Sequence, residues 1–82
     1  MDEKQIYTEL TSVFREVFDD DTLVLRPDLT AKDVEAWDSL NHVNLIVAAE
    51  SHFGIKFKTA EVESLQNVGH FVQLIGQKLA AK

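Results

Sequence analysis

The amino-acid sequence predicts an all-α fold, a four-helix bundle with main helices at about 3–18, 39–53 and 67–80, a short helix at about 60–65 and a long first loop at 19–37. Apolar residues recur at helical spacing in the three longer segments, and capping residues stand at their ends. No two segments alternate as paired strands would. With 82 residues, 45% of them hydrophobic and 27% charged, the chain suits a single modest core. We expect residues 1–82 to form one stand-alone domain.

The first helix is indicated by one apolar stripe with spacings of 4, 3, 1, 3 and 1. The stripe consists of Ile6, Leu10, Val13, Phe14, Val17 and Phe18. Asp19-Asp20-Asp21 ends this pattern, because short acidic side chains compete for backbone hydrogen bonds and would face the negative end of the helix dipole.

The segment 19–37 holds the only proline, Pro27, and has no sustained period. It therefore predicts a long connection, which is unusual in a small domain. Its expected apolar anchors are Leu23, Leu25, Leu29 and Val34. Thr30 and Asp33 resemble a capping pair, so we expect a short helical turn inside this loop.

The second helix has a signal at each end, Asp38 as N-cap and Gly54 just past its last turn. It carries more apolar surface than one core-facing stripe requires. One stripe contains Leu45, Ile46, Ala49 and Phe53, and the other, centred roughly 150° away, contains Leu40, Val43 and Val47. The second stripe starts beside Ser39 and would suit a docking surface if exposed. The alternative is that the long loop folds over it.

Short capping patterns predict the elements after residue 54. Residues 55–57 form a connector too short for a sheet, and Thr59 can cap the short third helix. Asn67 can cap the fourth helix, whose apolar residues repeat at helical spacing: Val68, Phe71, Val72, Ile75 and Leu79. Gly69 and Gly76 should each weaken that helix by about 1 kcal/mol relative to alanine.

The net charge of −6 argues against nucleic acids and anionic membranes as partners, because both would repel the chain. Residues 16–38 carry eight acids against Arg26 and Lys32, which fits a docking role or simply a solvated loop. The chain has no cysteine, which excludes disulfides and thiolate metal sites. It shows no leader or membrane-spanning segment. We expect a cytoplasmic, soluble monomer.

The second helix and its end contain one further set of residues: Asp38-Ser39-Leu40, Val43, Leu45-Ile46, Glu50 and Phe53-Gly54-Ile55. Together they resemble the modification-site region of acyl carrier proteins. The resemblance extends to nearly the whole chain in length, acidity and order of helices. It implies the acyl-carrier four-helix bundle and a carrier that is not itself an enzyme.

By this resemblance, Ser39 bears a covalent 4′-phosphopantetheine arm that holds acyl or aminoacyl groups as thioesters for partner enzymes. A phosphopantetheinyl transferase, the holo-acyl-carrier-protein synthase, would attach the arm from coenzyme A with the aid of magnesium. A helix N-terminus suits the anionic phosphodiester, because its free N–H groups and dipole favour negative charge. The resemblance also implies that Asp38 caps the helix, contacts the transferase and belongs to the cofactor-binding site beside Ser39. The protein would be a phosphoprotein of lipid or polyketide biosynthesis.

The resemblance also implies that Leu40, Val43, Val47 and Glu50 contact acyl or aminoacyl ligases, synthases and transferases. Carriers of fatty-acid synthesis usually have a strongly acidic second helix. Here the expected acids are replaced by Asn41, Asn44 and Ser51, and Trp37 replaces the small residue common before the motif. These departures predict a dedicated pathway with its own ligase or synthase.

Other functions compete with the carrier. The main alternative is an unmodified helical adaptor or subunit that binds a partner protein through the second-helix apolar strip. A hydrolase using Ser39 and His42 is disfavoured, because the chain has no glycine-rich oxyanion loop. The three histidines lack zinc spacing, and Asp19-Asp20-Asp21 lacks the glycine and glutamate of a calcium loop. We expect no catalytic residue and no metal.

Overall fold

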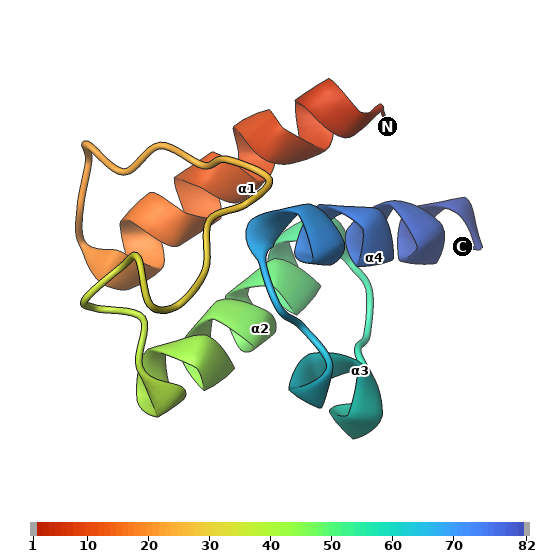
Figure 1. Cartoon of the computed structure of the whole chain (residues 1–82). Helices are drawn as coiled ribbons and strands as arrows, with labels where there is room; N and C mark the ends of the chain where they lie inside the picture. The colour runs from red at the N-terminus through yellow and green to blue at the C-terminus, as the bar shows by residue number, and fades with distance from the viewer. Residues whose placement is uncertain (1, 82) are drawn as a thin grey trace.

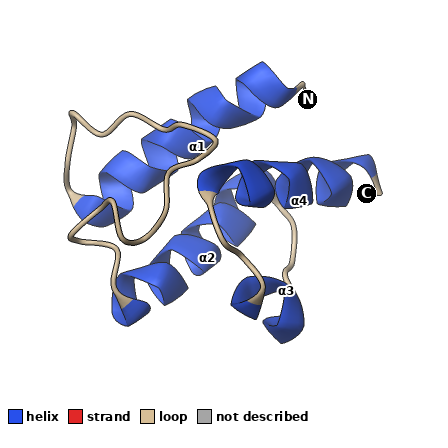
Figure 2. Cartoon of the chain, in the orientation of Figure 1, coloured by secondary structure: helices blue, strands red, loops and turns tan. Residues whose placement is uncertain are grey.

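The computed structural model describes residues 2–81, and within that range it contains four α-helices and no strand (Figures 1 and 2). The helices are α1 (Glu3–Phe18), α2 (Ser39–Phe53), α3 (Thr59–Glu63) and α4 (Val68–Ala80). The all-α prediction is confirmed, and the three main helices start and end within one residue of their predicted limits. Met1 and Lys82, the ends of the predicted domain, lie outside the described residues.

The core lies where α1 packs against both α2 and α4. Phe14 is fully buried, and its ring contacts those of Phe18, Trp37 and Phe71 at centroid distances of 5.5, 5.3 and 6.4 Å. From α2 the core receives the predicted stripe of Leu45, Ile46, Ala49 and Phe53. Burying this one face fixes which side of α2 remains in water. No helix in the described range combines the length and apolar character needed to cross a bilayer.

The long loop between α1 and α2 is tied to the start of α4, although the two are far apart in sequence (Figure 1). The N–H groups of Val68 and Gly69 donate to the carbonyl oxygens of Leu29 and Pro27, both at 2.9 Å. The first N–H groups of a helix have no acceptor within the helix. Here two carbonyl oxygens of the loop serve as acceptors for them. Leu29 is buried beneath this contact. The length of the loop is therefore used to reach and cap α4.

The short helical turn predicted at Thr30 is present only as a single hydrogen-bonded turn, in which the N–H of Asp33 donates to the Thr30 carbonyl oxygen at 3.0 Å, and no helix forms. The Thr30 N–H and hydroxyl both donate to Oδ2 of Asp33, at 3.0 and 3.2 Å. The capping contact therefore forms, but no apolar stripe follows that could extend it into a helix.

The short third helix was predicted at about 60–65 with Thr59 as its cap. In the structure Thr59 is already the first helical residue, and the helix ends at Glu63. Lys58 occupies the cap position, and its N–H donates to Oε1 of Glu61 at 2.7 Å. The same oxygen pairs with Nζ of Lys78 on α4 at 2.7 Å. The glutamate therefore both starts α3 and attaches it to α4.

Candidate functional site

The site begins at the N-terminus of α2, which is formed as predicted. Asp38 is the N-cap, and its Oδ1 accepts the N–H of Asn41 at 2.8 Å. Its carbonyl oxygen accepts the N–H of His42, also at 2.8 Å. Ser39 is the first helical residue and is exposed. The capped turn therefore presents a serine hydroxyl to solvent.

Unused hydrogen-bond donors surround that hydroxyl. Among the residues that the structure describes, none accepts a hydrogen bond from the backbone N–H of Ser39 or Leu40. The Ser39 hydroxyl is likewise unpaired in this part of the chain. Free N–H groups at the positive end of a helix dipole form a favourable environment for an anion. An anionic group on Ser39 would therefore be stabilised where it is attached.

Three large apolar side chains next to Ser39 are left uncovered. Leu40, Val43 and Val47 are 71%, 57% and 58% exposed, and together they form what we call the α2 strip. The long loop does not cover it, so that alternative is wrong. A contiguous apolar strip in water is typical of an interaction surface.

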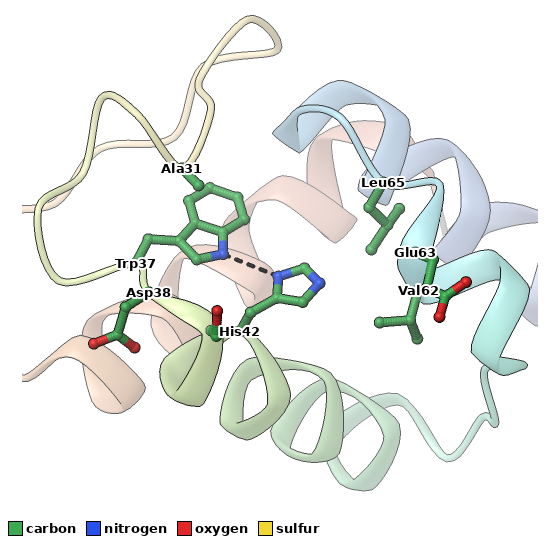
Figure 3. A pocket seen from close by; sticks show the side chains of 8 residues that line it. Ala31, Trp37, Asp38, His42, Val62, Glu63 and Leu65 are labelled. Carbon is green, nitrogen blue, oxygen red and sulfur yellow. Dashed lines mark hydrogen bonds between the residues drawn. The ribbon is translucent and has the colours of Figure 1, made fainter.

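Trp37, which the sequence marked only as a departure from the family, belongs to the core. Its ring lies edge-on to Phe14, with centroids 5.3 Å apart, and it is 9% exposed. Its Nε1–H donates a hydrogen bond of 3.0 Å to Nδ1 of His42 (Figure 3). The hydrogen bond between Trp37 and His42 could not be predicted from the sequence, which shows only that both residues lie near Asp38.

A pocket of about 530 Å³ opens between the start of α2 and α3 (Figure 3). Its lining residues are Ala31, Trp37, Asp38, Ser39, His42, Val62, Glu63 and Leu65. The contributions of Ala31, Val62, Glu63 and Leu65 had no sequence signal, because these residues lie outside α2 and only the fold brings them to Ser39. The pocket places Ser39 at the edge of a partly apolar cavity.

Glu50, predicted as a partner contact, also has a structural role. Its Oε2 accepts the N–H of Phe57 at 2.8 Å, so its carboxylate holds the connector between α2 and α3. Asn41, in a position where an acid was expected, donates its amide to the carbonyl oxygen of Ala36 at 2.7 Å. The exposed face of α2 is therefore apolar and amide-bearing, with little free negative charge.

The structure gives no support to hydrolase chemistry. Ser39 and His42 both line the pocket, but no hydrogen bond joins them, and Nδ1 of His42 is engaged by Trp37. Between residues 2 and 81 no three histidine or acidic side chains gather in a way that could hold a metal ion.

Comparisons with known proteins agree on one family. The chain is 33% identical to an acyl carrier protein of Acidothermus cellulolyticus, over 92% of this chain and 89% of that one. It is 36% identical to an acyl carrier protein of Petrotoga mobilis, over 93% of this chain and 81% of the other. A solution structure of a holo acyl carrier protein from Geobacter metallireducens is similar, with a TM-score of 0.88 and 49% identity, covering 93% of this chain and 87% of that one. No protein-family model matches the chain.

Proposed function

The chain belongs to the acyl carrier protein family, whose members are carriers and not enzymes, and from this premise we propose that Ser39 is the attachment point of its 4′-phosphopantetheine arm. The similar solved structure is that of a holo protein, which favours a loaded form here. We propose that residues 1–82 act as one carrier domain. The observation that carries the proposal is the exposed, unpaired hydroxyl of Ser39 at the capped start of α2.

The residues around Ser39 fit this prosthetic group. The free N–H groups of Ser39 and Leu40 would stabilise the phosphodiester, and Asp38 would keep the helix start in place through its bond to Asn41. When bound, the group supplies a terminal thiol on which an acyl chain is held as a thioester. The predicted contacts of Asp38 with the arm and with the transferase stay predictions, and its Oδ1 serves as the cap.

Loading is a phosphoryl-type transfer in which Ser39 is the nucleophile. Its Oγ attacks the phosphorus that bears the pantetheine portion of coenzyme A. The new O–P bond forms as the P–O bond of the diphosphate breaks, and adenosine 3′,5′-diphosphate leaves. The hydroxyl proton passes to a base on the transferase, which also holds the magnesium ion. The carrier contributes an accessible hydroxyl and supplies no general base of its own.

The α2 strip would present the loaded arm to partner enzymes. Leu40, Val43 and Val47 start beside Ser39 and continue along the same helix, so a bound partner would lie next to the attachment point. Docking would remove the exposed apolar surface of these side chains from water, which favours binding. Synthases, ligases and transferases of acyl or aminoacyl groups are the expected partners.

The chemistry of this surface favours dedicated partners over those of general fatty-acid synthesis. The acids expected on α2 are replaced by two amides and one hydroxyl, and Glu50 is engaged with Phe57. A basic enzyme patch would find little to attract it there, so association should be slow. Turnover by ordinary fatty-acid synthase enzymes at the rate of their own carrier would contradict this part of the proposal.

Intact-mass spectrometry tests the attachment directly. The purified full chain is incubated with coenzyme A, magnesium and a transferase of broad specificity, and one phosphopantetheine mass should be added. Ser39→Ala should gain no mass under the same conditions. The matched control is Ser51→Ala, since Ser51 is also exposed and on α2, and this variant should load like the wild type.

A mass increase on Ser39→Ala, or none on the wild type with several transferases, would reject Ser39 as the attachment point. The protein recovered from its native cells gives a second test, because its mass reports both modification and cargo. A wholly unmodified native protein with a stable partner bound would instead support the adaptor function.

A further inference from the structure

We propose that the groove between α1 and α2 binds a cationic amphipathic helix of a partner enzyme, with a lysine or arginine of that helix placed beside Glu16. This inference rests on the proposed function, because it assigns a surface to a partner of the carrier. The groove has a volume of about 500 Å³ and shares no lining residue with the pocket beside Ser39. It is lined by Val13, Glu16 and Val17 of α1 and by Asn44, Ala48, Ser51 and His52 of α2.

The groove follows the line along which two helices meet. α1 and α2 run in opposite directions and pack against each other (Figure 1). The lining residues of α2 extend from Asn44 to His52, which at 1.5 Å per residue gives about 12 Å, or roughly two helical turns. A groove of this kind can hold the apolar face of an amphipathic helix. We therefore expect a helical segment of about two turns as the occupant.

The floor of the groove is apolar and its α2 rim is polar without charge. Val13 is buried, and Val17 and Ala48 are half-buried. Ala48 carries only a methyl group, so a helix lying in the groove could come close to α2 at this point. The exposed side chains of Asn44 and Ser51 can form hydrogen bonds along the rim. The lining therefore suits small apolar side chains flanked by polar ones.

The charge in the groove selects a cationic occupant. Glu16 is exposed, and its carboxylate has no ion pair or hydrogen bond with any residue between 2 and 81. No lysine or arginine is among the lining residues, and Nε2 of His52 is held by Oε1 of Glu9 at 2.9 Å. A lysine or arginine beside Glu16 would complement this carboxylate. A second copy of the chain would instead bring like charge, because each copy has a net charge of −6.

The groove lies next to the α2 strip, so one partner could cover both. Val47 of the strip is three residues after Asn44 and four before Ser51, and residues at these spacings are neighbours on a helix surface. Ala48 follows Ser39 by nine residues, or about 14 Å along the helix axis. An enzyme bound in the groove would therefore lie within reach of the arm on Ser39. Its electrostatic contact would be with α1, and not with the weakly charged face of α2.

NMR titration of the unloaded full chain with a designed peptide tests the inference. The probe is a stapled helix of about 12 residues with leucine and alanine on one face and lysine on both flanks, because an unconstrained helix of this length is unstable in water. A second probe has glutamate in place of every lysine. The lysine probe should shift the amide resonances of Val17, Ala48 and Ser51. The glutamate probe should bind about tenfold more weakly.

Two variants with matched controls test the contacts. Glu16→Gln keeps the shape and removes the charge, and it should raise the Kd of the lysine probe about threefold, as expected for an exposed ion pair. The control Glu35→Gln changes an exposed acid of the long loop and should leave the Kd unchanged. Ser51→Tyr places a ring over the groove and should abolish the shift of Val17. The control Gln73→Tyr, at an exposed position of α4, should retain that shift.

Binding at another surface would overturn the inference. Shifts confined to Leu40 and Val43, or to the acids of the long loop, would show that the probe prefers those surfaces to the groove. Equal affinity of the two probes, or of Glu16→Gln and wild type for the lysine probe, would remove the charge argument and overturn the inference as well. A chain that gains the arm on Ser39 but shows no groove shifts would overturn this inference alone. A chain that binds the lysine probe in the groove but gains no arm would overturn the attachment alone.

Discussion

The N–H of Gly69 donates to the carbonyl oxygen of Pro27 at 2.9 Å, and this contact brings the loop close to the Cα atom of residue 69. A Cβ atom there would lie 3.0 Å from that oxygen and 3.3 Å from Cβ of Pro27. Such an approach is too close unless the loop moves. A side chain at Gly69 would therefore crowd the loop, whereas a Cβ on Gly76 would meet only Cδ1 of Ile6, at an ordinary 3.6 Å.

The two glycines of α4 should respond oppositely to alanine. Gly76→Ala should raise the free energy of unfolding by about 0.5–1 kcal/mol, because alanine favours the helix. Gly69→Ala should lower it by about 1 kcal/mol, because overpacking costs more than the helix propensity returns. Urea unfolding followed by circular dichroism measures both. Equal stabilisation by the two substitutions would show that the loop does not press on α4.

The cap of α2 should matter through its oxygen atom and not its charge. Asp38→Ala should cost about 1 kcal/mol of stability, because the N–H of Asn41 loses its acceptor. Asp38→Asn keeps an acceptor oxygen and should retain most of the stability. Chemical unfolding of the three proteins gives the comparison. An equal loss in both variants would mean that the negative charge itself stabilises the helix.

The α2 strip should affect partner binding without affecting folding. Val43 is 57% exposed, so Val43→Ala should leave the unfolding midpoint unchanged or slightly higher. It should reduce kcat/KM for loading by the transferase about fivefold, corresponding to about 1 kcal/mol of lost contact. The matched control is Val24→Ala, since Val24 is 64% exposed but lies in the loop. Similar losses in both variants would argue against a defined docking strip.

Glu61 should give the fold a component of stability that depends on acid pH. Hydrogen bonding to Lys78 and to the backbone of Lys58 holds the pKa of Glu61 below its ordinary value. A lowered folded pKa means that this stabilisation is complete above the ordinary glutamate pKa of about 4.3 and is lost as pH falls through the lowered value. Glu61→Gln should therefore be less stable than wild type at pH 7.

The matching measurement is unfolding over a range of pH. The difference between wild type and Glu61→Gln should shrink as the pH falls below about 4. A difference that stays constant down to low pH would mean that the carboxylate charge contributes nothing. The exposed neighbour Glu63, which has no partner among the described residues, supplies the control Glu63→Gln.

Much of the fold was predictable because it depends on interactions between residues close in sequence. The Asp38 cap, the stop at Gly54 and the Asn67 cap each involve neighbours three or four residues away. The start of α3 was missed by one residue, because Glu61 contacts the Lys58 N–H as well as Lys78 on another helix. Either Thr59 or Lys58 could precede the first turn of α3, and the contact of Glu61 with Lys78 on α4 accompanies the start that forms.

The candidate site likewise contains some features that local sequence predicts and others that depend on packing. Residue types and their spacing are enough to predict that Ser39 starts a capped helix and that α2 has two apolar stripes, since both follow from capping chemistry and helical periodicity. Three other features depend on how the helices and the loop pack: which stripe faces water, the hydrogen bond between Trp37 and His42, and the pocket that α3 forms beside Ser39. Those features depend on how a long loop brings distant segments together, and no spacing within one segment encodes that closure.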